Sequence, residues 1–267
     1  MYRHSNGLGA ILSYPFGGIP SDQVERILAT GGSDVDIFFV SMSAGDPAGR
    51  DHEYLEWHTY DHRPEQHRIK SIRASLRLMS TPTLHDARII SLAPYDEVDH
   101  VMTYFFDDAN GLAPFNELAQ ALREAGRMPL NLPPVDRNVF RVTTKASNRR
   151  LTIGADVLPW WPAESVYLLL ERGFAPVDLL LEVDGVAGIW SGAAAPEHLP
   201  ASLRTSTSQD SEGMQISYLF IDEDPLPVGE ALRPVLDDRW TTTGAVPLLA
   251  APFCSIHSRL DWERHSI

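Results

Sequence analysis

Two histidines lie one helical turn apart in a short segment that could carry acid/base chemistry. His58 and His62 are four positions apart, Asp61 lies between them, and Tyr54 lies one turn earlier. At about 100° per residue, Tyr54, His58 and His62 share one face of a helix. Near neutral pH an imidazole can accept or donate a proton, and a nearby carboxylate can fix its tautomer and raise its pKa. The spacing predicts a polar pocket in which one histidine accepts a proton, the other donates one, and Tyr54 hydrogen-bonds a carbonyl or enolate oxygen.

The helix that positions these side chains is expected over residues 53–63. Leu55 flanks the histidine face and Trp57 lies at its margin, so we expect this side to face a sheet, with Trp57 shaping the pocket. The opposite side takes Glu56, Thr59, Tyr60 and Arg63. Pro64 is expected to end or bend the helix, because its ring conflicts with the carbonyl oxygen four residues earlier. The same histidines could instead be core or rim residues whose hydrogen bonds only hold the helix in place.

Apolar periodicity predicts the remaining elements. In the first half, strands are expected at 35–42, 72–79, 99–106 and 138–144, and a second helix at 112–125. In the second half, strands are expected at 166–171, 185–191, 215–221 and 252–258, and a helix at 229–239. In the strand at 72–79, Arg73 and Arg77 fall on one face, where they could bind an anionic ligand group or remain exposed charge.

The two halves of the chain repeat one pattern at an offset of 114 positions. This offset places Tyr104 on Tyr218 and residues 139–142 on 253–256. Between its first two strands the second half is 15 positions shorter, which removes the counterpart of the histidine helix. We therefore expect two strand-helix-strand-strand-helix-strand units, at 1–147 and 165–267, with a linker at 148–164 and one site per chain.

Three segments outside this pattern carry weaker expectations. A short helix is expected to begin near Ser21. In the linker, Trp160 and Trp161 are expected to pack onto the body, with a lid over a cavity as the alternative. The polar stretch 201–213 is expected to be a mobile surface loop without a function.

Composition restricts the class of protein. The chain of 267 residues has 22 Lys and Arg against 36 Asp and Glu, a formal net charge of −14. This balance argues against nucleic acid and anionic membranes as partners, and favours neutral or cationic small molecules. No apolar run approaches the length of a membrane span. The single cysteine, Cys254, excludes an intrachain disulfide and a thiolate metal cage, and fits a cytoplasmic protein.

The histidine segment resembles a known family. The stretch from Glu53 to Glu65, with Tyr54, Trp57, His62 and Pro64 in this order, is similar to the helix carrying Tyr, Trp, His and Pro in the EthD-like branch of the dimeric α/β barrel superfamily. Residues 183–190 are similar to the Pro-Gly-Val turn that enters the second strand in such proteins. The resemblance covers most of 35–145 and, more weakly, 165–260. Ser71-Ile72-Arg73 departs from the usual turn in the first half.

The resemblance implies a fold and a range of functions. It implies an α+β chain in which two ferredoxin-like βαββαβ units are fused into an intrachain dimeric α/β barrel. It implies an enzyme of the lyase or isomerase type, which dehydrates, cyclises or isomerises an aromatic or polyketide-like substrate without a cofactor. His62 occupies the motif position and is therefore the leading acid or base, assisted by His58 and Asp61.

Two other functions stay open. One is a haem protein or haem-dependent oxygenase, with His62, His58 and His257 as candidate ligands. The other is a non-catalytic ligand-binding or assembly protein, and self-association into a homo-oligomer is compatible with either. A metal shared by His58 and His62 is not expected, because no third ligand is indicated.

Overall fold

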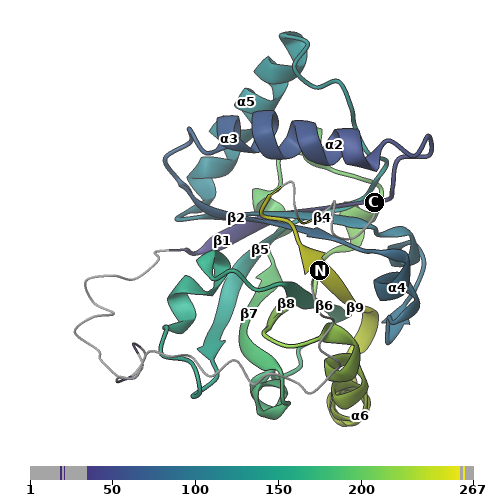
Figure 1. Ribbon diagram of the computed structural model, residues 1–267. Coiled ribbons are helices and arrows are strands. Elements are labelled where there is room, and N and C mark those ends of the chain that lie inside the picture. Colours follow the sequence, from purple (N-terminus) through teal and green to yellow (C-terminus); the bar gives the residue numbers. More distant parts are fainter. Residues whose placement is uncertain (1–18, 20, 22–34, 259–260, 262–267) are drawn as a thin grey trace, which may run out of the picture.

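Eight antiparallel strands form a closed sheet in the computed structural model, which describes residues 19, 21, 35–258 and 261 (Figure 1). The strands are β1 (Ile37–Ser43), β2 (Ile72–Met79), β3 (Ile90–Ser91), β4 (His100–Phe106), β5 (Pro134–Ser147), β6 (Ser165–Arg172), β7 (Val186–Ala194), β8 (Met214–Ile221) and β9 (Val246–Ser255). Their order is β2-β4-β1-β5-β7-β8-β6-β9-β3, and a further pairing of β2 with β9 closes the first eight into a barrel.

The strand order divides into two ferredoxin-like units. The first unit has the order β2-β4-β1-β5 and the second has the order β7-β8-β6-β9. The units join twice, through β5 with β7 and through β2 with β9. This confirms the predicted fold class, two βαββαβ units fused into an intrachain dimeric α/β barrel.

Helices cover the outside of the barrel (Figure 1). The helices and the π turn are α2 (Asp51–Trp57), η2 (His58–His62), α3 (Arg63–Gln66), α4 (Pro82–Asp86), α5 (Leu112–Glu124) and α6 (Pro225–Thr243). The 3-10 turns are η3 (Tyr95–Glu97), η4 (Ala109–Gly111), η5 (Ala155–Trp160), η6 (Asp178–Glu182), η7 (Pro196–His198), η8 (Ala201–Leu203) and η9 (Thr207–Asp210). Helices α2, α3 and α5 lie over the first unit and α6 lies at the other end of the molecule. The short turn η6 stands where the first unit has α2, η2 and α3. No helix of the described residues is long and apolar enough to cross a membrane.

The barrel interior is filled by large side chains from both units. Phe38 packs against Phe105, Phe140 and Tyr218 with ring centroids 5.7, 5.8 and 5.7 Å apart. Trp190 is fully buried among them. The interior is thus a core, and the chemistry-bearing residues lie outside it, between the sheet and the helices.

The predicted offset between the units is correct for one strand pair and wrong for two. A β-bulge follows Ile72 in β2 and Val186 in β7, and these two positions are 114 apart. In β4 and β8, however, the strand partners make Thr103, not Tyr104, the counterpart of Tyr218. In β5 and β9, Phe140 corresponds to Phe253. The one-residue errors matter because neighbouring residues of a strand face opposite sides of the sheet.

Thr103 and Tyr218 meet across the barrel. Their hydroxyl oxygens are 2.7 Å apart and both residues are fully buried. We expect Tyr218→Phe to lower the free energy of unfolding by about 1–2 kcal/mol, because the Thr103 hydroxyl loses its partner. Thr103→Val is expected to cost a similar amount. The double variant should cost less than the sum in urea unfolding, and strictly additive losses would contradict a direct bond.

Several boundaries and loops differ from the predictions. The last strand, β9, ends at Ser255, so His257 lies beyond it. Neither linker tryptophan covers a cavity: Trp160 is exposed, and Trp161 packs on the barrel core. The stretch 201–213 is docked, because Ser208 donates a 2.6 Å hydrogen bond to the carbonyl of Arg137. The helix predicted to follow Ser21 lies outside the described residues.

Candidate functional site

The histidine helix changes geometry in its middle. After α2, residues His58–His62 form a π turn, in which the Arg63 N–H donates to the carbonyl of His58, five residues earlier. The wider turn accommodates Pro64, which has no N–H to donate, so the helix continues as α3 instead of ending. The extra residue also turns Thr59 inward, where it is 5% exposed, against the prediction that it faces outward. His58 and His62 are buried, as the helical spacing indicated.

A small pocket lies between this helix and the sheet, and we call it the helix–sheet pocket. Its volume is about 110 Å³. Tyr54, Trp57, His58 and His62 line it from the helix, and Tyr104 of β4 lines it from the sheet. Aromatic rings form much of the wall: the Trp57 ring lies 4.9 Å from His62. The indole of Trp57 also donates a 3.0 Å hydrogen bond to the carbonyl of Arg127, which fixes the loop after α5.

Unpaired polar atoms gather around the helix–sheet pocket. Among the described residues, 14 buried side-chain atoms have no hydrogen-bond partner, and eight of them belong to the histidine helix or to the facing strands β2 and β4; those of His58, His62 and Tyr104 line the pocket itself. They are His58 Nδ1, Thr59 Oγ1, His62 Nδ1, Gln66 Oε1, Arg77 Nε, Arg77 Nη2, His100 Nδ1 and Tyr104 Oη. Because buried polar groups are nearly always paired, such a concentration indicates a place for a ligand or water.

The one hydrogen bond of the His62 ring sets its tautomer. In the orientation that the structure gives the Gln66 amide, its Nε2 lies 3.3 Å from His62 Nε2 and donates to it, which assigns the proton of the neutral ring to Nδ1. That Nδ1–H has no acceptor among the residues that the structure describes, so it is available to an oxygen of a ligand. The His58 ring lies 5.4 Å from the His62 ring and also has a free Nδ1.

Both histidines are neutral at physiological pH. Burial lowers the pKa of His62 to about 4, although the charge of Asp61 acts in the opposite direction. Burial, assisted by the charge of Arg77, holds the pKa of His58 well below its usual value. The expected effect of Asp61 is present for His62, but desolvation outweighs it, so the net pKa is lowered and not raised.

Asp61 does not contact either imidazole. Both of its carboxylate oxygens accept from Arg127 Nη2 at 2.9 Å, on the outer side of the helix. Glu65 accepts from the other terminal nitrogen of Arg127 at 2.9 Å. Asp61 thus ties the helix to the loop after α5, and the structure does not bring it together with His58 and His62.

The two arginines predicted on one strand face are separated. Arg77 is 2% exposed and faces the helix, with its guanidinium carbon 4.7 Å from the centre of the Tyr54 ring. Arg73 is exposed. The bulge between Ile72 and Ala74 interrupts the alternation on which the prediction rested. Arg77 therefore belongs to the surroundings of the helix–sheet pocket and Arg73 does not.

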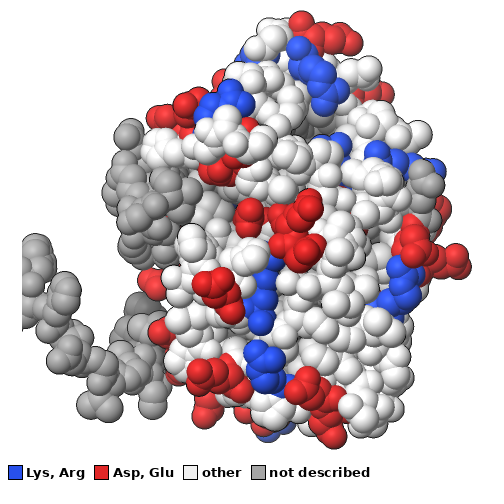
Figure 2. Space-filling view, turned by 90° about the vertical axis from the view of Figure 1, so that its right-hand side faces the viewer, with Lys and Arg blue, Asp and Glu red and all other residues white. Residues whose placement is uncertain are grey.

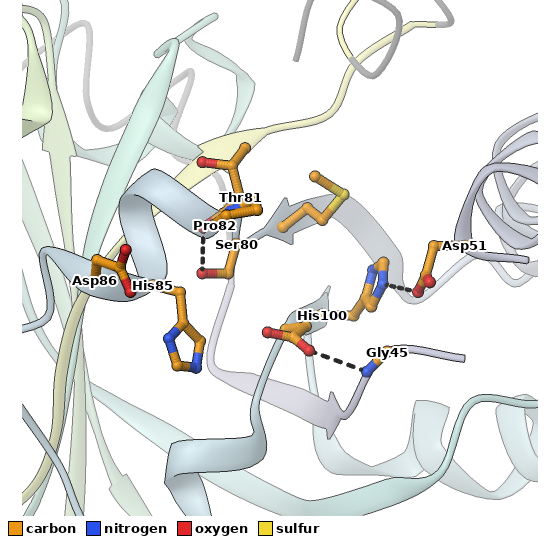
Figure 3. A pocket seen from close by; sticks show the side chains of 10 residues that line it. Gly45, Asp51, Ser80, Thr81, Pro82, His85, Asp86 and His100 are labelled. Carbon is orange, nitrogen blue, oxygen red and sulfur yellow. Dashed lines mark hydrogen bonds and ion pairs between the residues drawn. The ribbon is translucent and has the colours of Figure 1, made fainter. Parts of the chain in front are cut away.

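A second, larger cavity opens beside the first, and we call it the rim cavity (Figure 3). Its volume is about 490 Å³ and its walls include Asp51, Ser80, His85, Asp99 and His100. His100 Nε2 lies 2.7 Å from Asp51 Oδ1, which makes a carboxylate–histidine pair. The His100 ring lies edge-on to Tyr54, 5.8 Å away, so this pair stands between the two cavities.

Sequence reasoning missed His100 and Asp51. His100 begins β4, and Met102 and Tyr104 follow it on the side of the strand that faces the helices. The alternation along the strand could therefore have indicated that the His100 side chain also faces the helices. Asp51 begins α2 and meets His100 only through tertiary packing. Leu203, which lines the helix–sheet pocket, comes from the stretch predicted to be a mobile loop.

The helix–sheet pocket does not fit haem. A cavity of about 150 Å³ holds one benzene ring. At about 110 Å³, the space beside His58 and His62 cannot take a macrocycle of four pyrroles. His257 is exposed, and its Nε2 lies 3.3 Å from the carbonyl oxygen of Ala163. Among the described residues no group of three or more His, Cys, Asp or Glu has the arrangement of a metal site.

Comparisons with known proteins return structures but no sequence relatives. No model of a protein family matches the chain, and no curated protein matches it. A crystal structure described as an "anthrone oxidase-like protein" is 13% identical, with a TM-score of 0.48 over 85% of this chain and 94% of that one. One described as a "putative chlorite dismutase" is 11% identical, with a TM-score of 0.46 over 86% and 99%. A "putative monooxygenase" from Fusobacterium nucleatum is 9% identical, with a TM-score of 0.45 over 84% and 93%.

The strand order and the closure of the sheet define the fold. The chain is a dimeric α/β barrel with both units in one polypeptide.

Proposed function

We propose that this protein is a small-molecule enzyme that performs acid/base chemistry on an aromatic substrate in the helix–sheet pocket, without a cofactor. The reaction class is dehydration, cyclisation or isomerisation, in which a proton leaves a carbon or hydroxyl and another reaches an oxygen. The observation that carries the proposal is the set of unpaired buried polar atoms around two neutral histidines. The resemblance of the histidine helix to the EthD-like branch supports it.

His62 is proposed to act on the substrate oxygen. Its free Nδ1–H donates a hydrogen bond to a carbonyl or departing hydroxyl oxygen. A neutral imidazole can stabilise a developing enolate in this way. His58, whose Nδ1 also has no partner among the described residues, is proposed to accept the proton that leaves the substrate. Trp57 and Tyr54 are proposed to hold the aromatic ring.

Pocket size limits the substrate. Enzyme pockets for small molecules usually measure about 300–1,000 Å³. The helix–sheet pocket, at about 110 Å³, is smaller than both this range and the cavity of about 150 Å³ that holds benzene, so a single ring is the most that it can hold, and only if the walls give way slightly. A polyketide-like substrate would place its remaining atoms in the rim cavity, past Tyr54 and His100.

Deuterium exchange tests the proposed chemistry before the natural substrate is known. The purified protein would be incubated in D2O with a panel of one-ring aromatic ketones, each with an enolisable position. We expect mass spectrometry to find protein-dependent deuterium incorporation into at least one compound. Binding of panel members without exchange would favour a non-catalytic ligand-binding protein.

Two further expectations accompany the proposal. The cytoplasm is the expected compartment, given the single cysteine, Cys254. Self-association into a homo-oligomer stays a prediction, which sedimentation of the purified protein would test.

A further inference from the structure

Three arginines around the helix–sheet pocket have no carboxylate partner among the described residues. Arg123 and Arg137 line the pocket, and none of the described lining residues is Asp or Glu. Burial, assisted by the nearby charge of Arg123, lowers the pKa of Arg137. The guanidinium of Arg77 lies over the Tyr54 ring. Its positive charge contributes to the lowered pKa values of His58, His62 and His100. The described lining of the pocket therefore carries two arginines and no carboxylate, and a third arginine, Arg77, is buried nearby.

Arginines elsewhere in the molecule are commonly paired. Those with a carboxylate within 4.0 Å include Arg50, Arg68, Arg127, Arg141, Arg150 and Arg172. Acidic and basic side chains are interspersed over the face shown in Figure 2. With 36 Asp and Glu against 22 Lys and Arg, carboxylates are abundant in this chain. Their absence from the described pocket lining is thus a local property of the site.

Arg77 makes the strongest case for a missing anion. It is 2% exposed, yet its Nε and Nη2 have no hydrogen-bond partner among the described residues. A buried charge without a partner is strongly unfavourable. The aromatic face of Tyr54 compensates only a part of this cost.

We propose that the ligand of the helix–sheet pocket is a one-ring aromatic anion, whose negative oxygen is bound by Arg137 and stabilised by the nearby charge of Arg77. The negative oxygen belongs to a carboxylate or an ionised phenol. The inference rests on the proposed function for placing the substrate in this pocket, and it names the substrate class. It reverses the expectation from net charge, which favoured neutral or cationic ligands.

A bound anion also completes the acid/base machinery. A negative charge beside an imidazole favours its protonated form and raises its pKa. An anionic substrate would therefore raise the pKa of His62 above its ligand-free value, towards the neutral range in which proton transfer is efficient.

Calorimetric titration with matched probes tests the charge preference. Benzoate and benzamide have nearly the same shape and differ in charge, and 4-nitrophenolate represents the ionised phenol. We expect benzoate or 4-nitrophenolate to bind the full chain at least tenfold more tightly than benzamide. The anion that binds more tightly identifies the source of the negative oxygen.

Three arginine variants locate the preference. Arg137→Met should reduce the preference for the anion to near one, and Arg77→Lys should retain more of it than Arg77→Met. Arg73→Met is the matched control, because Arg73 is exposed on the same strand as Arg77 and lies outside the pocket. Should Arg77→Met fail to fold, as judged by circular dichroism, Arg137→Met and Arg77→Lys still decide the outcome.

The inference would be overturned by equal binding of benzoate, 4-nitrophenolate and benzamide, by no binding of any probe at millimolar concentration, or by an unchanged preference in Arg137→Met. The proposed function fails separately. If the anions bind selectively while no compound exchanges deuterium, the ligand class stands and the catalytic role falls. If neutral compounds exchange deuterium and the protein shows no preference for anions, the catalytic role stands and the proposed ligand class falls.

Discussion

Replacing His62 with glutamine is expected to lower the rate of deuterium exchange by about 100- to 10,000-fold, the usual contribution of a positioned acid or base. Glutamine keeps a polar side chain in the pocket but cannot transfer a proton at the same position. His58→Gln should also reduce the rate, because exchange at carbon needs a base and His62, whose Nδ1 carries the proton, cannot accept a second proton there. The rates would be measured by mass spectrometry under saturating substrate.

His198→Gln provides the control for this experiment. His198 lies in η7 and lines neither cavity. Its exchange rate should equal that of the unmodified protein. A His62→Gln variant that folds normally and exchanges deuterium at the full rate would remove His62 from the mechanism.

Acidification is expected to destabilise the protein through its buried histidines. His62 has a pKa of about 4 in the folded chain and near 6.5 when unfolded. The unfolded state therefore binds the extra proton first, so the stability is complete above pH 6.5 and falls as the pH drops towards 4. For a shift of this size, the loss through His62 alone is about 3 kcal/mol. His58 and His100 act in the same direction, because burial lowers the pKa of each.

Urea unfolding at several pH values between 7 and 4 measures this loss. His62→Gln removes the contribution of His62 to this loss. The free energy of unfolding of the variant should therefore fall by about 3 kcal/mol less than that of the unmodified protein between pH 7 and 4. His198→Gln should follow the unmodified protein. Equal losses for His62→Gln and the unmodified protein would show that His62 is not held neutral by burial.

The fold was largely predictable because its strands carry strong periodic patterns. The run around β1 and the alternation in β2 predicted strands close to those observed. The equivalence of Tyr104 and Tyr218 was wrong by one position, because the offset of 114 holds for β2 and β7 but not for β4 and β8. A uniform offset cannot account for single-residue changes in the loops between strands.

The site was predictable only where it depends on local spacing. The burial of His58 and His62 followed from their separation along the helix. The inward turn of Thr59 depends on a π turn, which the helical period does not indicate. The separation of Arg73 from Arg77 depends on a bulge, and the pair of Asp51 with His100 joins a helix to a strand 49 positions away. Such features arise from tertiary packing.

The charge of the pocket was the least predictable property. A net charge of −14 describes the whole chain and gives no indication of where carboxylates are absent. Arg77 on β2, Arg123 on α5 and Arg137 on β5 come together only in the folded molecule. Their position underlies the proposed preference for an anionic ligand, which is opposite to the preference that the composition indicated.

Histidine-selective NMR of the folded protein tests the central claim most directly, namely that His62 is a neutral ring in a pocket that ligands reach. The ring resonances of His62, assigned with His62→Gln, would be followed between pH 4 and 8, without ligand and with benzoate. We predict a ring that stays neutral until the pH falls to about 4, and resonances that shift when benzoate is added. A ring that titrates near 6.5 and ignores benzoate would contradict the account.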